Sequence, residues 1–316
     1  MKLVTYDRGD EPRAGVVVDE QVLDAATLLS EGRGLRDVRA LLELPNDPLT
    51  RLKSVLNSAG GVPLTSVRLR APILQPPTVR DFMVYEGHAS AGRTRELPDA
   101  WYRLPIFYFS SPLCIFGPDD AVPYPSASEQ LDYELELAAV IGREGRNIAE
   151  ADAFSYIAGF TIFNDWSCRD LQRDEMAARL GPAKGKDSAS SLGPWIVTTD
   201  ELAPFIRDGR LHARCSLKVN GTTWMDNDAG LMYHTWGAMI ERASRDSRIV
   251  PGDVIGSGTV TGGSIGEAIR NGFHARYLQP GDIVEIAVEG IGILRNTIAP
   301  KLNPDPNYRF KAPRPK

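Results

Sequence analysis

The chain has 316 residues, 42% of them hydrophobic and 24% charged, which is typical of a globular protein with a substantial core and excludes disordered and collagen-like chains. The 36 Lys and Arg residues against 41 Asp and Glu residues give a formal net charge of −5, so nucleic acid and anionic membranes are poor candidate partners. No apolar run approaches the roughly 20 residues that span a bilayer.

The spacing of the cysteines and the composition of the first residues bear on the cellular compartment of the protein. Three widely spaced cysteines, Cys114, Cys168 and Cys215, form neither a disulfide framework nor a zinc pattern. Residues 1–6 lack the apolar core of a signal peptide. We therefore expect a cytoplasmic protein.

The N-terminal residues predict a small α/β domain. The expected elements are paired strands at residues 3–6 and 15–18 and short helices at residues 24–29 and 37–42. Prolines at positions 72, 76 and 77 then interrupt the pattern, which places a domain boundary after residue 72.

Residues 73–302 are rich in strand patterns and form the second predicted domain. Pro-Gly-Asp turns at residues 251–253 and 280–282 each lead into an apolar run, which favours a mixed or antiparallel assembly over a doubly wound parallel sheet. Helical patterns are expected at residues 149–157, 168–179 and 233–244. Residues 303–316 contain four prolines and predict an extended tail.

The segment of residues 131–137 alternates strictly between apolar and polar residues. It predicts a strand on which Glu134 and Glu136 point the same way, about 7 Å apart. Two such like charges repel each other unless a cation lies between them. A solvated sheet face is the alternative, but the strand continues as an apolar run at residues 138–141 and is therefore expected to be central. Acids at the mouth of a buried strand favour a bound cation.

Two further acids lie where elements begin or end. Asp165 follows the apolar run of residues 157–162 and precedes a helical pattern, where it could act only as an N-cap. Asp81 follows the proline boundary and could cap a turn. A ligand set of oxygens alone would select Mg²⁺, Mn²⁺ or Ca²⁺ rather than zinc or copper.

A series of short motifs extends along residues 72–300. They are Val-Arg-Asp-Phe at 79–82 with His88 seven residues after Asp81, Asp-Tyr-Glu-Leu-Glu at 132–136, Asn-Asp-Trp-Ser-Cys-Arg-Asp-Leu-Gln at 164–172, Gly-Pro-Ala-Lys-Gly-Lys at 181–186, Gly-Ser-Gly-Thr at 256–259, and the segment 280–292. In order and spacing they resemble the fumarylacetoacetate hydrolase family, in particular its bacterial fumarylpyruvate and acylpyruvate hydrolases.

This resemblance implies an α+β fold, a mixed β-sandwich roll of the fumarylacetoacetase C-terminal type behind the small N-terminal α/β domain. It implies a homodimer, with Mg²⁺ or Mn²⁺ as the common ion and Ca²⁺ in some members. Each role also falls on a residue of this chain: Asp81, Glu134, Glu136 and Asp165 as metal ligands, His88 as the group that activates water, and Arg169, Gln172, Lys186, Tyr108 and Thr259 as residues that meet the substrate.

Some of these roles also make physical sense. A histidine with its usual pKa near 6.5 suits a general base at cytoplasmic pH. Glu86, two residues before His88, is the first candidate for the carboxylate that orients it, and Glu267 is a weaker one. Lys186 lies in a glycine-containing loop and could stabilise a developing enolate.

Arg169 and Gln172 are three residues apart and share a helix face, where an arginine suits bidentate binding of a substrate carboxylate. A surface salt bridge on that helix is the alternative interpretation for Arg169.

Two departures narrow the substrate. Met83 and Met176 stand where the long eukaryotic members carry tyrosines near the substrate, so fumarylacetoacetate itself is in doubt as the substrate.

The glycine-rich run at residues 256–263 lacks the spacings of nucleotide-binding loops, and we expect close approach of its backbone to a substrate oxygen instead.

The sequence therefore predicts a metal-dependent hydrolase that cleaves a C–C bond in a β-diketo acid or acylpyruvate through a metal-bound enolate. Its partner would be a small anionic 2-oxo or diketo acid. The same metal site could instead serve an oxaloacetate decarboxylase, an isomerase or a 2-oxo-enoate hydratase. An alternative of another class is a catalytically silent member that only binds metal or ligand.

Overall fold

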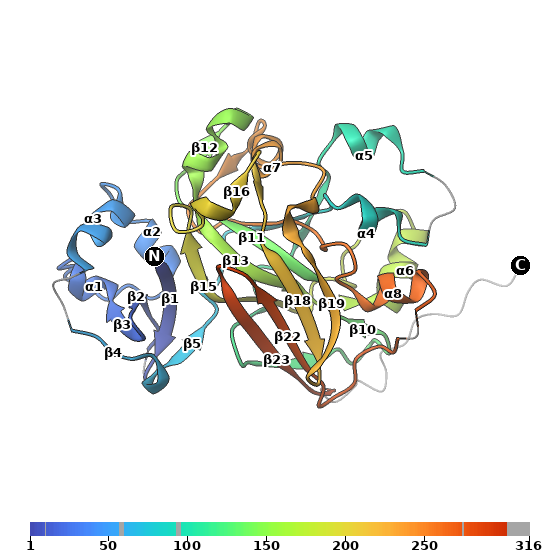
Figure 1. The fold of residues 1–316 in the computed structure, drawn as a ribbon, viewed down its shortest axis with the longest axis horizontal. Helices are drawn as coiled ribbons and strands as arrows, with labels where there is room; N and C mark the ends of the chain where they lie inside the picture. The colour runs from blue at the N-terminus through green and yellow to red at the C-terminus, as the bar shows by residue number, and fades with distance from the viewer. Residues whose placement is uncertain (10, 57–59, 93–95, 274, 302–316) are drawn as a thin grey trace, which may run out of the picture.

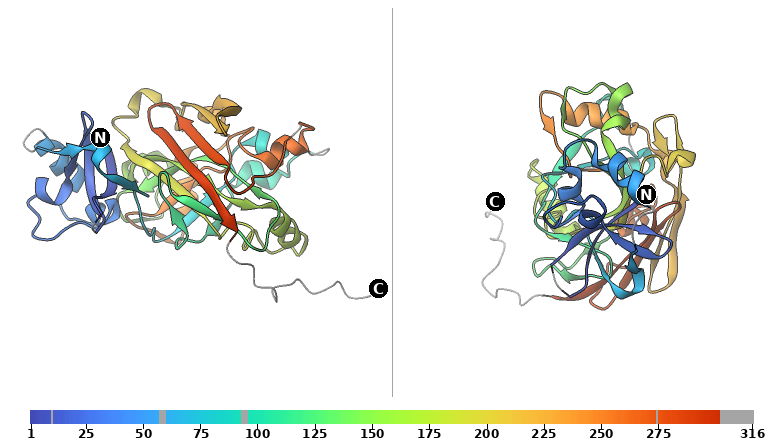
Figure 2. Two further views of the ribbon diagram at one scale, coloured as in Figure 1. Left: turned by 90° about the horizontal axis from the view of Figure 1, so that it is seen from below. Right: turned by 90° about the vertical axis from the view of Figure 1, so that its left-hand side faces the viewer.

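The computed structural model describes residues 1–9, 11–56, 60–92, 96–273 and 275–301, and the predicted tail at 303–316 lies outside these ranges. Within them a mixed sheet of twelve strands extends through the molecule, and a second, five-stranded sheet lies across it (Figures 1 and 2). The predicted mixed, strand-rich architecture is confirmed.

The strands of the large sheet follow the order β4 (Val62–Pro63), β3 (Gln21–Asp24), β2 (Arg13–Val18), β1 (Lys2–Asp7), β15 (Ser190–Thr198), β13 (Ile157–Asp165), β11 (Leu135–Ile141), β21 (Val254–Gly256), β6 (Val79–Phe82) and β7 (Phe107–Ser110). In addition, β5 (Arg68–Arg70) pairs with β1, and β8 (Ile115–Phe116) pairs with β15. The β21–β6 and β15–β8 pairs are parallel and the others are antiparallel.

The second sheet has the order β19 (Thr222–Asp228), β18 (Arg214–Val219), β22 (Ile283–Val288), β23 (Gly292–Lys301) and β9 (Ala121–Tyr124). Three short strand pairs complete the sheets: β10 (Leu131–Asp132) with β14 (Ser167–Cys168), β12 (Gly145–Arg146) with β20 (Arg248–Ile249), and β16 (Ile206–Arg207) with β17 (Arg210–Leu211).

The α-helices are α1 (Ala25–Leu28), α2 (Val38–Leu42), α3 (Pro48–Val55), α4 (Glu86–Ser90), α5 (Asp99–Arg103), α6 (Arg169–Ala177), α7 (Trp236–Ser244) and α8 (Ile265–Arg270). The 3₁₀ helices are η2 (Leu64–Ser66), η3 (Glu150–Tyr156), η4 (Ala203–Phe205) and η5 (Ala229–Leu231). The three predicted helical patterns therefore correspond to η3, α6 and α7. None of the helices in the described ranges is long and apolar enough to cross a membrane.

The strands and helices predicted within the N-terminal α/β unit are present, and α1–α3 lie at one end of the molecule (Figure 1). Asp24 and Asp37 cap α1 and α2 by accepting hydrogen bonds from backbone N–H groups of the first turn. The strands of this unit do not form a separate sheet, because β1 pairs with β15 and extends the large sheet. Leu3 of β1 and Ile196 of β15 accordingly pack in one cluster of the hydrophobic core.

The segment of residues 131–137 differs from the single continuous strand that its alternation predicts. It forms β10 and β11, which pair with different strands, and Tyr133 and Glu134 lie between them. The break occurs because Glu134 pairs with Ser264 in an isolated bridge instead of continuing β11. The prediction of a central strand is confirmed for β11, which is buried along its whole length between β13 and β21.

A buried ion pair joins the parallel strands beneath the candidate site. Arg80 and Asp253 are 4% and 1% exposed, and Nη1 of Arg80 donates to Oδ2 of Asp253 at 3.3 Å. Thr78 accepts from the same Nη1 at 2.6 Å and donates to Asp253 at 2.7 Å. The three side chains thus satisfy one another away from water.

We expect Asp253→Ala to lower the free energy of unfolding by about 3–5 kcal/mol, because it leaves the Arg80 guanidinium buried without its carboxylate. Denaturant unfolding followed by circular dichroism measures the loss. The control is Asp226→Ala, which breaks an exposed pair with Arg214 and should leave the unfolding midpoint nearly unchanged. Equal midpoints for the two variants would contradict the prediction.

Candidate metal centre and active site

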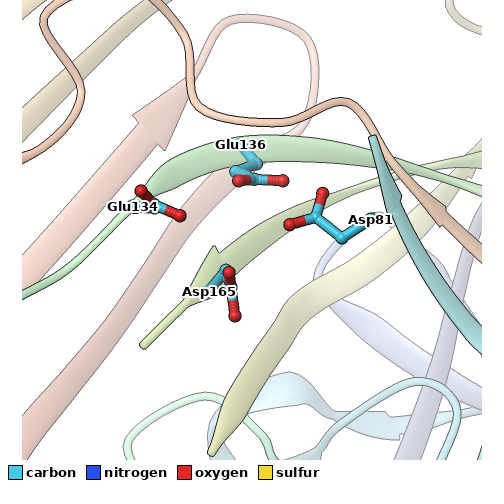
Figure 3. Close-up of side chains that lie close together, drawn as sticks. All are labelled: Asp81, Glu134, Glu136 and Asp165. Atoms are coloured by element: carbon cyan, nitrogen blue, oxygen red, sulfur yellow. The ribbon is translucent and has the colours of Figure 1, made fainter. Parts of the chain in front are cut away.

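Four buried carboxylates converge at the middle of the large sheet. Asp81 lies on β6, Glu136 on β11 and Asp165 at the end of β13, while Glu134 immediately precedes β11. One ligand oxygen from each lies within 4.8 Å of the others, and none of the four residues is more than 4% exposed. Figure 3 shows the carboxylates pointing toward one another. The structure therefore brings together all four residues that the family resemblance implied as metal ligands.

The donor set of this cluster suits a divalent cation. It consists of carboxylate oxygens, the ligands that hard cations prefer. Oδ1 of Asp165 is buried and has no hydrogen-bond partner, although a buried carboxylate oxygen ordinarily has one. A cation bound among the four carboxylates would satisfy this oxygen.

The electrostatics of the cluster lead to the same conclusion. Burial raises the pKa of Asp165 to about 8, and the charges of Asp81 and Glu134 add to the rise although Lys186 opposes it. Burial also raises the pKa of Asp81, and it raises that of Glu136 together with the charge of Asp81. The carboxylates thus repel one another in a place that water cannot screen.

Glu134 is the exception. Burial opposes its ionisation, but Arg169 and Lys186 hold its pKa well below the ordinary value. Lys186 is 3% exposed, and its ammonium donates to Glu134 and, at 2.5 Å, to Asp165. The structure therefore places the predicted catalytic lysine at the edge of the acidic cluster.

Arg169 is held by the protein at each of its three guanidinium nitrogens. Nε donates to Asp132 at 2.7 Å, Nη2 to Glu134 at 2.7 Å and Nη1 to Gln172 at 2.9 Å. The alternative interpretation of Arg169, a salt bridge on the surface of the helix, is wrong, because Arg169 is 8% exposed and contacts Glu134 of the cluster. Its contact with a substrate carboxylate stays a prediction, as does that of Gln172.

Asp132 is a residue of this site to which the sequence analysis gave no role. It is fully buried, and besides Arg169 it accepts hydrogen bonds from the backbone N–H groups of Ile265 and Gly266 at 2.8 and 2.7 Å. One carboxylate thus joins β10, α6 and the start of α8. The alternation of Asp132, Glu134 and Glu136 was the available signal, since it places all three on one side of an extended chain.

His88 lies on α4 with one ring nitrogen toward a glutamate and the other toward the cluster. Nδ1 lies 2.9 Å from Oε2 of Glu267, and Nε2 lies 3.8 Å from Oε1 of Glu134. Of the two predicted partners of His88, the weaker candidate Glu267 is therefore the one that contacts it, and the first candidate, Glu86, is wrong. Glu86 is exposed and accepts a hydrogen bond from Tyr102 at 2.5 Å, because residues two apart on a helix point roughly 200° away from each other.

Two other predicted residues also border the cluster. The hydroxyl of Tyr108 donates to Asp81 at 2.7 Å and also to Asp165. The hydroxyl of Thr259 lies 3.5 Å from Oε1 of Glu136. Both hydroxyls contact carboxylates of the cluster, and their contact with a substrate stays a prediction.

The glycine-rich loop approaches the carboxylates through its backbone. The N–H of Gly258 lies 3.0 Å from Glu136 and 3.2 Å from Asp81. The φ angle of Gly258 is +78°, and a Cβ there would stand 2.2 Å from the carbonyl oxygen of Phe82. Only glycine can occupy this position without moving its neighbours.

A family model described as "Fumarylacetoacetate (FAA) hydrolase C-terminal" matches residues 78–299. This chain belongs to the fumarylacetoacetate hydrolase family. It is 31% identical over 265 residues to the oxaloacetate tautomerase YisK of Bacillus subtilis (strain 168), a match that covers 82% of this chain and 81% of that protein.

Solved structures share the fold. The fumarylacetoacetate hydrolase of psychrophilic Exiguobacterium antarcticum has a TM-score of 0.74 and 26% identity, over 95% of this chain and all of that chain. The maleylpyruvate hydrolase of Sphingobium sp. SYK-6, crystallised with manganese(II) and pyruvate, has a TM-score of 0.72 and 22% identity, over 96% of this chain and all of that chain. The predicted family and fold type are confirmed, and the homodimer stays a prediction.

We expect the protein to bind a divalent cation and to lose most of that affinity on Glu136→Gln or Asp165→Asn. Removing a ligand carboxylate should cost at least the roughly 10- to 100-fold that is typical for residues that only support a ligand. Calorimetric titration of chelator-treated protein with Mn²⁺ measures the affinity. Asp226→Asn, an exposed carboxylate outside the cluster, is the matched control. Wild-type affinity in both cluster variants would overturn the assignment.

Proposed function

We propose that the protein is a divalent-metal-dependent hydrolase that cleaves a C–C bond in a β-diketo acid of the acylpyruvate type. The observation that carries the proposal is the placement of His88, whose Nδ1 lies against Glu267 while Nε2 is directed toward the acidic cluster. With Nδ1–H donating to Glu267, Nε2 keeps its lone pair and can accept a proton.

The four carboxylates would hold Mg²⁺ or Mn²⁺, with Ca²⁺ as a further option, since these are the cations that oxygen-only sites select. When bound, the cation supplies Lewis-acid polarisation of the substrate's carbonyl oxygens. The buried setting of the cluster excludes bulk water, which strengthens every charge interaction inside it.

The residues of the chain perform the proton transfers. A water gives a proton to Nε2 of His88 while its oxygen bonds to the carbonyl carbon of the acyl part. The bond from that carbon to the neighbouring CH₂ then breaks, and the electron pair remains with the 2-oxo acid part. The proton on His88 passes to the CH₂ carbon, which becomes a methyl group, so the products are a carboxylic acid and a 2-oxo acid. Lys186 places a positive charge beside this region.

A second function is favoured by one observation, the 31% identity to an oxaloacetate tautomerase. In that reaction His88 would move a proton between carbon and oxygen of the substrate without water attack. Product analysis separates the two functions, because a tautomerase changes the enol absorbance of oxaloacetate without forming a new acid, whereas a hydrolase converts an acylpyruvate to two acids.

We expect His88→Ala to lower kcat on an acylpyruvate by roughly 10²- to 10⁴-fold, the usual contribution of a general base, while Mn²⁺ affinity stays at the wild-type value. Loss of enol absorbance, with the products identified by NMR, measures the rate.

Two glutamate variants form a matched pair for the same assay. Glu267→Gln should lower kcat at least ~10-fold, because a neutral amide orients the imidazole of His88 less firmly and stabilises the imidazolium formed during the reaction less well than a carboxylate does. Glu86→Gln should stay close to wild type, since Glu86 faces Tyr102. Full activity of His88→Ala, or a larger loss in Glu86→Gln than in Glu267→Gln, would rule out the proposed mechanism.

A further inference from the structure

A second guanidinium lies beside the candidate active site. Arg270 is the last residue of α8 and follows Glu267 by three positions, so the two side chains share a face of that helix. Nε of Arg270 donates to the carbonyl oxygen of Ala91 at 3.2 Å, and Ala91 is the residue that ends α4. Arg270 therefore lies next to the helix that carries His88.

Gly266 brings Arg270 close to Arg169. The point at which a Cβ would stand on Gly266 lies 3.3 Å from Nη1 of Arg270 and 3.1 Å from Nε of Arg169. The two guanidinium groups therefore flank the same glycine, one from α8 and one from α6. Burial of part of the Arg270 side chain and the charge of Arg169 lower the pKa of Arg270, although the charges of Glu267 and Glu134 oppose this shift.

The two arginines differ in what they are able to bind. Arg169 is buried, and each of its nitrogens already donates to Asp132, Glu134 or Gln172. Arg270 is exposed, and among the described residues its Nη atoms meet no carboxylate. Two cations side by side are stabilised by an added anion, and Arg270 is the one that can reach an anion from solution.

We propose that Arg270 is a specificity-determining residue that binds a second carboxylate on the acyl part of the substrate. This inference rests on the proposed function and assigns to Arg270 the discrimination between β-diketo acids that carry an outer carboxylate and those that do not. The substrate then lies with its 2-oxo acid end at the acidic cluster and its outer carboxylate at the paired N–H groups of Arg270. Arg169 acts instead as a positioning residue that holds Glu134.

The kinetic test uses two substrates of equal length. Fumarylpyruvate carries the outer carboxylate, and crotonylpyruvate has a methyl group in its place. For Arg270→Gln we expect the KM for fumarylpyruvate to rise about 10- to 100-fold, the range for losing hydrogen bonds to a charged group, with kcat and the crotonylpyruvate constants near wild type. Arg270→Lys, which keeps the charge but not the paired donors, should be intermediate.

Arg173→Gln is the matched control, because Arg173 is exposed on α6 and, among the residues that the structure describes, its side chain donates only to Gln130. It should behave as wild type with both substrates. Equal losses on both substrates in Arg270→Gln, or no loss on either, would overturn the role of Arg270.

A binding measurement keeps this inference separate from the proposed function. Calorimetry on the Mn²⁺-loaded protein compares 2-oxoheptanedioate, which has the seven-carbon chain length of fumarylpyruvate, with 2-oxoheptanoate, which has a methyl group in place of the outer carboxylate. Wild type should prefer 2-oxoheptanedioate, and Arg270→Gln should lose that preference. If neither diketo acid is turned over but the preference and its loss are seen, the proposed hydrolysis fails and the role of Arg270 stands. If wild type shows no preference, the role of Arg270 fails.

Discussion

The mutual repulsion of four buried carboxylates is the constraint on which the arrangement of this molecule depends. Two unit charges 4 Å apart repel by about 4 kcal/mol at an effective dielectric constant of 20, and the ligand oxygens of Asp81, Glu134, Glu136 and Asp165 lie within 4.8 Å of one another. Lys186 and Arg169 compensate only Glu134 and Asp165 directly. Oδ1 of Asp165 is buried and accepts no hydrogen bond from the residues that the structure describes, so the compensation within the protein is incomplete.

Such a cluster needs a rigid frame, which the central strands of the large sheet provide. Asp81, Glu136 and Asp165 lie on strands connected through the β6–β21–β11–β13 ladder, so backbone hydrogen bonds fix their separation. Close approach also requires that intervening residues be small. A Cβ on Gly256 of β21 would stand 2.6 Å from Oδ1 of Asp81. Because β21 lies between β11, which carries Glu136, and β6, which carries Asp81, it can carry no side chain at that point.

The sequence predicts the local parts of this arrangement better than the long-range ones. The course of β11 could be predicted because a run that is apolar on both faces occurs in central strands, and the Asp24 and Asp37 caps because their partners lie three residues away. The partner of His88 was among the two candidates but was ranked second, because Glu267 lies 179 residues away and only the tertiary fold brings α8 to α4. A neighbour in sequence, Glu86, was the wrong choice for the same reason.

The break between β10 and β11 also escaped prediction, since alternation continues through it, yet it has a consequence for the site. Because the strand is interrupted at Glu134, Asp132 can pair with β14 beside α6. Its carboxylate can then accept hydrogen bonds from the first backbone N–H groups of α8. Asp132 thereby holds Arg169 on one side and sets the start of the helix that carries Glu267 and Arg270 on the other. Glu134, Glu267 and Arg270 are thus fixed relative to one another through the single buried carboxylate of Asp132, so a shift of α8 would displace Glu267 and Arg270 together.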